Sequence, residues 1–444
     1  MTSHPLIHSE AISALVPILL RNSSSRKLLL ADGFLKRLRL DIARVVGSAD
    51  NDGKINNECE ALTWLMASFS QEELFNDDSQ IVISFLKSAL QWQIEMNERG
   101  IVIVEVICFS LESLIRSEAT LNLIFCDEVL QRLIELFSVG NYSLVEASLR
   151  VVGTMIYWGN EVHTEKILAA EALQNIRPLI SSTRTHPPPS SLICTALRIL
   201  SNIACGSVHH ANALFESNLI PWVICLLLSE IEEEQKEAFY VIESVAEKGA
   251  DLLKQLGAWN VVGGVCQLIE KLKTKALEED EKAEKHKMYR SHQKDSDADI
   301  RFQCSRIGDE DSDEENENCS EEEEPVDEGY ANLVLRCLQF LLKMIQLGDQ
   351  QQMKDSIISE EVMGKEPLNF VEHSAADCDM GVELPSEENI TSDEVKGSEN
   401  IYATQFEDEN GIEILHELEQ MRNQQVHKIV FTLQKFFATE KDIT

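Results

Sequence analysis

A pattern of apolar segments recurs along the chain at intervals of just over forty residues, and this repeat constrains the fold most. Each of five such segments contains one small polar residue: Ser68, Ser113, Thr154, Asn202 or Ser244. Their spacings are 45, 41, 48 and 42 residues. Shorter apolar segments lie between them, and two of these contain Pro178 and Pro221, which are 43 residues apart. Self-similarity at a fixed period predicts a repeat architecture.

The segments themselves have the periodicity of amphipathic helices. Asp127–Ser138 (DEVLQRLIELFS) places its apolar residues on one helical face, and Ile101–Cys108, the only strand-like run, continues at helical spacing. Pro17, Pro178 and Pro221 are expected at helix starts or just inside them, where a missing N–H costs little.

Units of 40–47 residues with two or three helices are typical of armadillo and HEAT repeats. One such unit cannot bury its apolar face alone, so neighbouring units must stack. The predicted fold class is therefore all-α, an armadillo/HEAT-type right-handed superhelical solenoid with two disordered acidic insertions.

The net charge is very unevenly distributed. The 444 residues include 39 Lys+Arg and 76 Asp+Glu, a formal charge of −37. Glu278–Gly329 has 21 acidic and 7 basic residues, and Asp355–Gly411 has 16 and 2, so each segment carries −14. Both lack apolar periodicity, and we expect them to be disordered because they cannot offset the entropy of ordering. The charge favours basic partners and argues against direct nucleic-acid or membrane binding.

These patterns divide the chain into five parts. We predict armadillo repeats over 1–277, a disordered acidic insertion within a repeat over 278–329, and the third helix of that repeat over 330–352. A second disordered acidic insertion follows over 353–410, and terminal repeat helices occupy 411–444. Long insertions are tolerated because closure entropy grows only logarithmically with loop length.

Several other functions are not expected. The eleven cysteines include no Cys-x-x-Cys pair, which favours reduced thiols in a cytoplasmic and nuclear protein. Neither a secretion signal nor a membrane-spanning run of about 20 apolar residues is found. Phosphate-loop, serine-hydrolase and zinc-protease motifs are missing from the sequence, so we expect no enzyme, no metal and no cofactor.

Three stretches resemble the armadillo repeats of importin-α, the adaptor family that reads nuclear localisation signals. They are ALRILSNIACG at Ala196–Gly206, KEAFYVIESVAEKG at Lys236–Gly249, and the closing stretch GIEILHELEQMRNQQVHKIVFTLQKFF at Gly411–Phe437. The resemblance implies an adaptor for basic cargo segments in nuclear import, with nuclear transport receptors as further partners. Met1–Asp50 lacks the dense basic arm of that family, which argues against ordinary importin-β docking.

The resemblance also implies a peptide-binding groove. In that family a Trp and an Asn, four residues apart on each third helix, hold Lys or Arg stems and the peptide backbone. This chain retains one of each, in different repeats. The corresponding candidate pairs are Trp64 with Ser68, Phe109 with Ser113, Arg150 with Thr154, Arg198 with Asn202, and Tyr240 with Ser244.

Other interpretations remain open at these positions. Trp64, Phe109 and Tyr240 could equally pack between helices, and Asn202 could bond within the solenoid. The alternative function is a scaffold or acidic chaperone for basic proteins, such as histones or ribosomal proteins, that no longer reads localisation signals. Three serines directly precede acidic residues and suit an acid-directed kinase: Ser312, Ser320 and Ser392.

Overall fold

The computed structural model describes residues 5–49, 57–74, 76–92, 94–181, 187–278, 282, 330–361, 400–421 and 423–437. Within these ranges every regular element is a helix, and no residue lies in a strand. The chain divides into two compact units, unit 1 (Met1–Trp259) and unit 2 (Asn260–Thr444). The predicted all-α class is confirmed.

Unit 1 contains sixteen helices in the described ranges. They are α1 (Pro5–Arg21), α2 (Ser23–Ala31), α3 (Phe34–Ala49), α4 (Asn57–Ser70), α5 (Asn76–Leu90), α6 (Glu98–Leu114), α7 (Glu118–Ile124), α8 (Asp127–Leu136), α9 (Tyr142–Trp158), α10 (Glu161–Ala169), α11 (Ala172–Ile180), α12 (Ser190–Ala204), α13 (Val208–Glu216), α14 (Ile220–Leu226), α15 (Glu232–Ala246) and α16 (Ala250–Gly257).

Three successive repeats have the armadillo arrangement of two short helices and a long third one. They are α7–α8–α9, α10–α11–α12 and α13–α14–α15. Each begins with the same local device, because Ser117, Asn160 or Ser207 caps the first helix and accepts a hydrogen bond from the backbone N–H three residues later. The sequence thus marks the start of each repeat with a capping residue.

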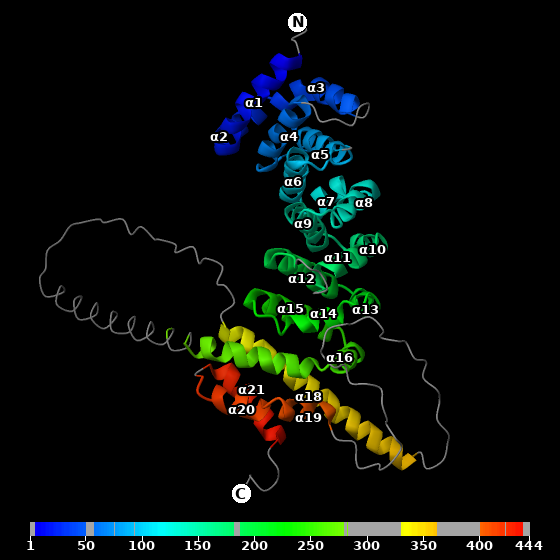
Figure 1. Ribbon diagram of the computed structural model, residues 1–444, viewed down its shortest axis with the longest axis vertical. Helices are drawn as coiled ribbons and strands as arrows, with labels where there is room; N and C mark the ends of the chain where they lie inside the picture. Colours follow the sequence, from blue (N-terminus) through cyan, green and yellow to red (C-terminus); the bar gives the residue numbers. More distant parts are fainter. Residues whose placement is uncertain are drawn as a thin grey trace, which may run out of the picture. The chain divides into compact units, whose positions relative to one another are not determined.

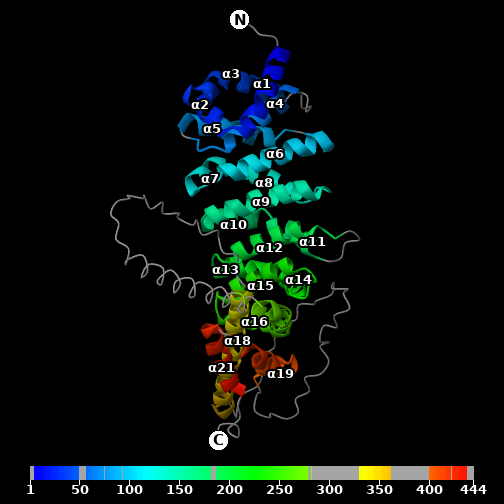
Figure 2. The same cartoon turned by 90° about the vertical axis from the view of Figure 1, so that its left-hand side faces the viewer.

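The long helices of unit 1 pack against one another in chain order. Helix α4 packs on α1, α6 on α4, α9 on α6, α12 on α9 and α15 on α12. Figure 1 shows α6, α9, α12 and α15 following one another on one side of unit 1, with the first and second helices on the other. In Figure 2, α7, α10 and α13 follow one another in the same way. Stacking of repeats around a continuous apolar core confirms the predicted armadillo-type solenoid.

The close packing of α9 on α12 depends on one glycine. A Cβ added at Gly153 would lie 3.2 Å from Cγ1 of Ile199, which is fully buried on α12. Because Gly153 has no side chain, α9 and α12 can lie close together at this point, and the interior between them is packed without voids.

A left-handed residue joins the first helix to the second in several repeats. Glu171 (φ 61°), Asn260 (φ 52°) and Asn410 (φ 58°) each directly precede a second helix, and Asn218 (φ 51°) lies two residues before α14. Asparagine tolerates this conformation because its short side chain bonds locally, whereas glutamate does not. Glu171 is therefore the strained member of the set.

Unit 2 contains the helix at residues 261–278, α18 (Tyr330–Glu361), α19 (Ile401–Asp408), α20 (Gly411–Leu418) and α21 (Gln424–Phe437). Helix α18 packs on α19 and α21, and α20 packs on α21. The last three helices again form a short–short–long repeat.

Parts of the predicted second insertion, 353–410, are helical, which corrects its boundaries. Helix α18 continues to Glu361, and Ile401–Asp408 forms α19. Phe406 of α19 is fully buried and stacks on Phe437 with ring centroids 5.2 Å apart. A helix of eight residues with one buried aromatic gives too short a periodic signal to be detected in an acidic stretch.

The compact units divide at Trp259, before the predicted boundary at 277. The helix at residues 261–278 belongs to unit 2 because Gln267 Nε2 donates to Glu409 Oε2 at 3.4 Å and Lys273 pairs with Glu417. The remaining parts of both acidic segments, with Ser312, Ser320 and Ser392, lie outside the described residues.

The proline prediction was wrong at two of three positions. Only Pro221 lies in the first turn of its helix, α14, whereas Pro17 lies inside α1 and Pro178 near the end of α11. A single lost backbone hydrogen bond is tolerated where the flanking residues pack, as Ile176 and Leu179 do.

Candidate functional site

All ten predicted groove residues lie on the stacked long helices α4, α6, α9, α12 and α15 of unit 1. We call the side of these helices that carries them the third-helix face, after the third helices of the three repeats. Phe109, Ser113, Arg150 and Arg198 are exposed on it. Half-buried positions on the same helices are Trp64, Thr154, Asn202 and Tyr240. Ser68 is fully buried and Ser244 nearly so.

The hydroxyl groups of the candidate pairs bond to their own helices. Ser113 Oγ, Thr154 Oγ1 and Ser244 Oγ donate to the carbonyl four residues earlier at 2.8, 2.9 and 2.7 Å. Ser68 Oγ donates to Leu65 O at 2.7 Å. Because Ser68 and Ser244 are also buried, their assignment as peptide-contacting residues is corrected to a packing role.

Arg150 occupies the position at which a partner's cation would meet Phe109. Its guanidinium lies 5.5 Å from the centroid of the Phe109 ring, and its Nε and Nη2 donate to Glu112 Oε1 at 3.1 and 3.0 Å. Both attractions hold the arginine toward α6. The aromatic face of Phe109 is therefore filled from within the chain.

Arg198 is held in the opposite direction. Its Nε donates to Glu237 Oε1 on α15 at 2.6 Å, although 63% of the arginine side chain is exposed. Burial raises the pKa of Glu237, and the bound guanidinium only partly opposes this. Arg150 thus reaches toward the preceding third helix and Arg198 toward the following one.

A groove opens between α9 and α12, where the two arginines diverge. Its volume is about 540 Å³, and its floor includes Gly153 and Ile199. Four of the predicted residues line it, namely Arg150, Thr154, Arg198 and Asn202. The lining residues that were not predicted include Tyr157 and Trp158.

Tyr157 and Trp158 form an exposed aromatic pair at the end of α9. Their rings meet edge to face with centroids 5.3 Å apart, and the side chains are 70% and 39% exposed. The sequence signal was weak, because two aromatic residues closing an apolar helix are usually core residues. Only their place one turn beyond Thr154, just before the helix end at Gly159, indicated solvent exposure.

Asn202 supplies an amide that faces this groove. Among the described residues its side chain has no hydrogen-bond partner, although it is half-buried. Trp158 and Asn202 therefore line one groove although they belong to consecutive repeats. Sequence comparison within single repeats could not pair them.

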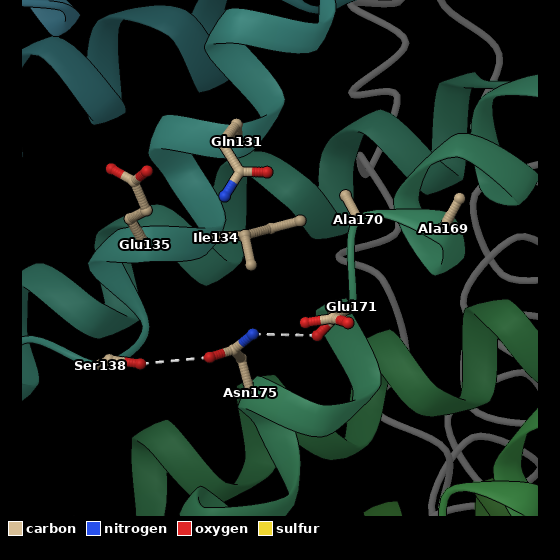
Figure 3. A pocket seen from close by; sticks show the side chains of 8 residues that line it. All are labelled: Gln131, Ile134, Glu135, Ser138, Ala169, Ala170, Glu171 and Asn175. Atoms are coloured by element: carbon tan, nitrogen blue, oxygen red, sulfur yellow. Dashed lines mark hydrogen bonds between the residues drawn. The ribbon is translucent and has the colours of Figure 1, made fainter.

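A second depression, of about 380 Å³, lies between α8 and α11 (Figure 3). Ser138 Oγ contacts Asn175 Oδ1 at 3.1 Å, and Asn175 Nδ2 donates to Glu171 O at 3.0 Å. The first bond links the C-terminal end of α8 to α11, whereas the second lies at the start of α11 itself. Gln131 and Glu135 complete the polar rim. The depression carries neither a cation nor an aromatic ring among its lining residues.

The depression of unit 2, about 250 Å³, is acidic. Glu270, Glu409, Glu413 and Glu417 line it around Lys273. Partial burial lowers the pKa of Lys273, but the hydrogen bonds that its ammonium group donates to Glu270 and Glu417 together raise it. The lysine already neutralises part of this cluster.

Nothing in the described ranges has the arrangement of a catalytic or metal centre. Burial raises the pKa of the Cys108 and Cys266 thiols to about 12, so neither forms the reactive thiolate. No three His, Cys, Asp or Glu side chains of the described chain converge as metal ligands. Within the same ranges, no helix has the length and apolar character of a membrane span.

Comparison with solved structures finds engineered repeat proteins. One engineered protein has a TM-score of 0.51 at 14% identity, over 98% of this chain and 96% of that one. A designed armadillo repeat protein has a TM-score of 0.42 at 17% identity, over 52% and 91% of the two chains. Another, in complex with the peptide (KR)4, has a TM-score of 0.43 at 16% identity, over 52% and 90%.

No protein-family model matches the sequence, and no curated protein matches it. At these identities the structural likeness concerns the fold alone. The repeats, their caps and their stacked third helices define the chain as an armadillo-type α-solenoid.

Proposed function

We propose that the chain is an adaptor that binds an extended segment of a partner protein along the third-helix face. The observation that carries this proposal is the groove between α9 and α12. It combines exposed aromatic rings at Tyr157 and Trp158 with the free amide of Asn202. Aromatic anchors and convergent polar groups in a concave site are typical of recognition surfaces.

The partner segment we propose is basic, similar to a nuclear localisation signal. Glu146 supports this choice, because it lines the groove and its only bond in the described chain is from Ser191 Oγ at 2.9 Å. The net charge of −37 would also speed capture of a cationic partner. Under this proposal the chain acts in nuclear import, in the cytoplasm and the nucleus.

Fluorescence anisotropy with a labelled Lys/Arg-rich peptide tests the proposal. We expect micromolar binding that weakens as salt rises from 0.05 to 0.5 M, since exposed charges are screened. Trp158→Ala and Asn202→Ala should each weaken binding about tenfold, the effect of losing one anchor. Gln131→Ala, which removes an exposed amide from the other depression, is the matched control and should change nothing. Binding that none of the groove variants alters would contradict the groove assignment.

A second candidate is the acidic chaperone, which the charge distribution favours. The segments 278–329 and 355–411 together account for −28 of the −37 charges. In this case deleting residues 278–329 abolishes binding of a basic protein such as a histone, while Asn202→Ala has no effect. For the adaptor the deletion only weakens binding.

A further inference from the structure

We infer that unit 2 binds an acidic segment of a partner protein along the exposed sides of its two long helices, residues 330–348 of α18 and residues 424–437 of α21. We call these two exposed sides together the basic face. The site goes beyond the proposed function, because it lies in unit 2 and recognises a partner of the opposite charge.

The charged residues of these helices are sorted by sign. Residues 330–348 and 424–437 contain four Lys or Arg and no Asp or Glu, although 76 of the 444 residues of the chain are acidic. The short helices α19 and α20 have the opposite character, with four acidic residues and no Lys or Arg. The last repeat is therefore acidic on its short helices and basic on its long one.

The exposed side of α18 consists of amides and a cation. Gln339, Lys343 and Gln346 are exposed at spacings of four and three residues, which places them on one side of the helix. The opposite side is buried, since Leu341 and Ile345 are fully enclosed. Amide groups can donate to and accept from a peptide backbone, and a lysine can bind a carboxylate. This side therefore suits a peptide with acidic side chains.

The exposed side of α21 combines two lysines with an aromatic ring. Lys428 and Lys435 are exposed and seven residues apart, about 10 Å along the helix, and lie opposite buried Val430 and Leu433. Phe431, between the two lysines, is 57% exposed, and the Lys435 ammonium group lies 4.3 Å from the centroid of its ring. A segment whose carboxylate pairs with Lys435 therefore passes beside this ring, and an apolar side chain of the segment can cover it.

The two helices present these sides together. Helices α18 and α21 pack on one another, as Figure 1 shows, and each buries the side that lies opposite its lysines. Packed helices lie about 8–10 Å apart, and an extended chain rises about 3.3 Å per residue. A segment of four or more residues is therefore long enough to reach from one helix to the other.

The lysines of the basic face have no carboxylate partner in the described chain. Lys343, Lys428 and Lys435 form no ion pair within the described ranges. In unit 1, by contrast, Arg198 on the long helix α12 is already paired with Glu237 on α15. Unpaired cations on a surface without acidic residues create a local positive potential, and an acidic partner complements it.

Fluorescence anisotropy with the full chain and three labelled octapeptides tests the site. The first peptide alternates Glu and Ser around a central Leu, the second has Gln in place of each Glu, and the third has Ser in place of Leu. We expect the first to bind about tenfold tighter than the second at low salt, since each exposed ion pair contributes about two- to fivefold. This difference should shrink at 0.5 M salt because the charges are screened.

Two triple variants locate the effect. The first replaces the three lysines of the basic face: Lys343→Gln, Lys428→Gln and Lys435→Gln. The matched control replaces three exposed lysines of unit 1: Lys27→Gln, Lys36→Gln and Lys254→Gln. Both variants make the net charge more negative by the same amount, and the first alone should lose the preference for the Glu peptide. Circular dichroism and thermal melting show whether each variant is folded.

A single substitution tests the aromatic contact. Phe431→Ser leaves the lysines in place, so the preference for Glu over Gln should remain. The advantage of the Leu peptide over the Ser peptide, which we expect to be about threefold in the unchanged chain, should disappear with the apolar contact.

Four results would overturn the inference. The first two are equal affinity for the Glu and Gln peptides, and a preference that both triple variants lose equally. The third is tighter binding of an oligothymidylate than of the Glu peptide, which would assign the face to nucleic acid. The fourth is binding of the Glu peptide only after residues 283–329 and 362–399 are replaced by Gly/Ser linkers of equal length. That result would show that the acidic segments of the chain itself occupy the face.

Discussion

Glu171 holds a backbone conformation that its side chain disfavours, and replacing it should stabilise the protein. Its φ and ψ are 61° and 30°, at the N-cap of α11. A non-glycine residue here costs about 1–2 kcal/mol. Glycine removes that cost but adds about 0.4–1 kcal/mol of unfolded-chain entropy. We therefore expect Glu171→Gly to raise the free energy of unfolding by about 0.5–1 kcal/mol.

The side chain itself contributes little that the substitution would lose. Within the described chain the Glu171 carboxylate forms no hydrogen bond, and its backbone oxygen, which accepts from Asn175 Nδ2, is retained in glycine. Figure 3 shows that bond beside the carboxylate. Glu171→Asn should also stabilise, because asparagine occupies the corresponding position directly before a helix at 260 and 410.

Urea unfolding monitored by circular dichroism measures the effect. A gain of about 0.75 kcal/mol with a slope near 3 kcal/mol/M raises the midpoint by about 0.3 M. Glu171→Ala removes the carboxylate but keeps the strain, so it should shift nothing. Gln174→Gly, at an exposed position inside the same helix, should cost about 1 kcal/mol. A lower midpoint for Glu171→Gly would refute the strain argument.

Two further substitutions test unit 2 and the third-helix face. A Cβ at Gly411 would lie 2.4 Å from Cζ of buried Phe406, so Gly411→Ala should destabilise unit 2 by about 1–3 kcal/mol, measured as increased amide hydrogen exchange in α19 and α21. Burial raises the pKa of Glu237 above its usual 4.5, so its folded form binds protons more tightly than its unfolded form. The stability contribution of Glu237 is therefore complete below pH 4.5 and is lost as pH rises through the raised pKa. Unfolding of Glu237→Gln and wild type across pH 4–8 should show this slope only in wild type, and identical slopes would contradict it.

The helices and the apolar periodicity within each helix could be predicted from the sequence, because both depend on residues close to one another along the chain. The four-residue spacing of Arg150 and Thr154 places them on one side of α9, and Arg198 and Asn202 have the same spacing on α12. Such spacing is a local property of the helix. This spacing, together with the family resemblance from which the candidate pairs were taken, allowed the third-helix face to be predicted residue by residue.

The ion-pair partners and the exposure of those residues could not be predicted, because they depend on contacts between repeats. Arg150 meets a carboxylate 38 residues earlier, and Arg198 meets one 39 residues later. No local pattern encodes whether each arginine pairs with a carboxylate of the preceding or of the following repeat. The exposed aromatic pair and the helix α19 were missed for the same reason, since burial is a property of the packed chain.

The sequence by itself determined an all-helical repeat chain, the order of its third helices and the concentration of negative charge. These follow from periodicity and composition, which each segment of the chain shows without reference to its tertiary contacts. Only the tertiary structure decided that Arg150 fills the face of Phe109 and that Trp158 and Asn202 line one groove across a repeat boundary. Such pairings arise from the distance and register between stacked helices, and α9 and α12 lie close together at Gly153 and Ile199, which line the groove.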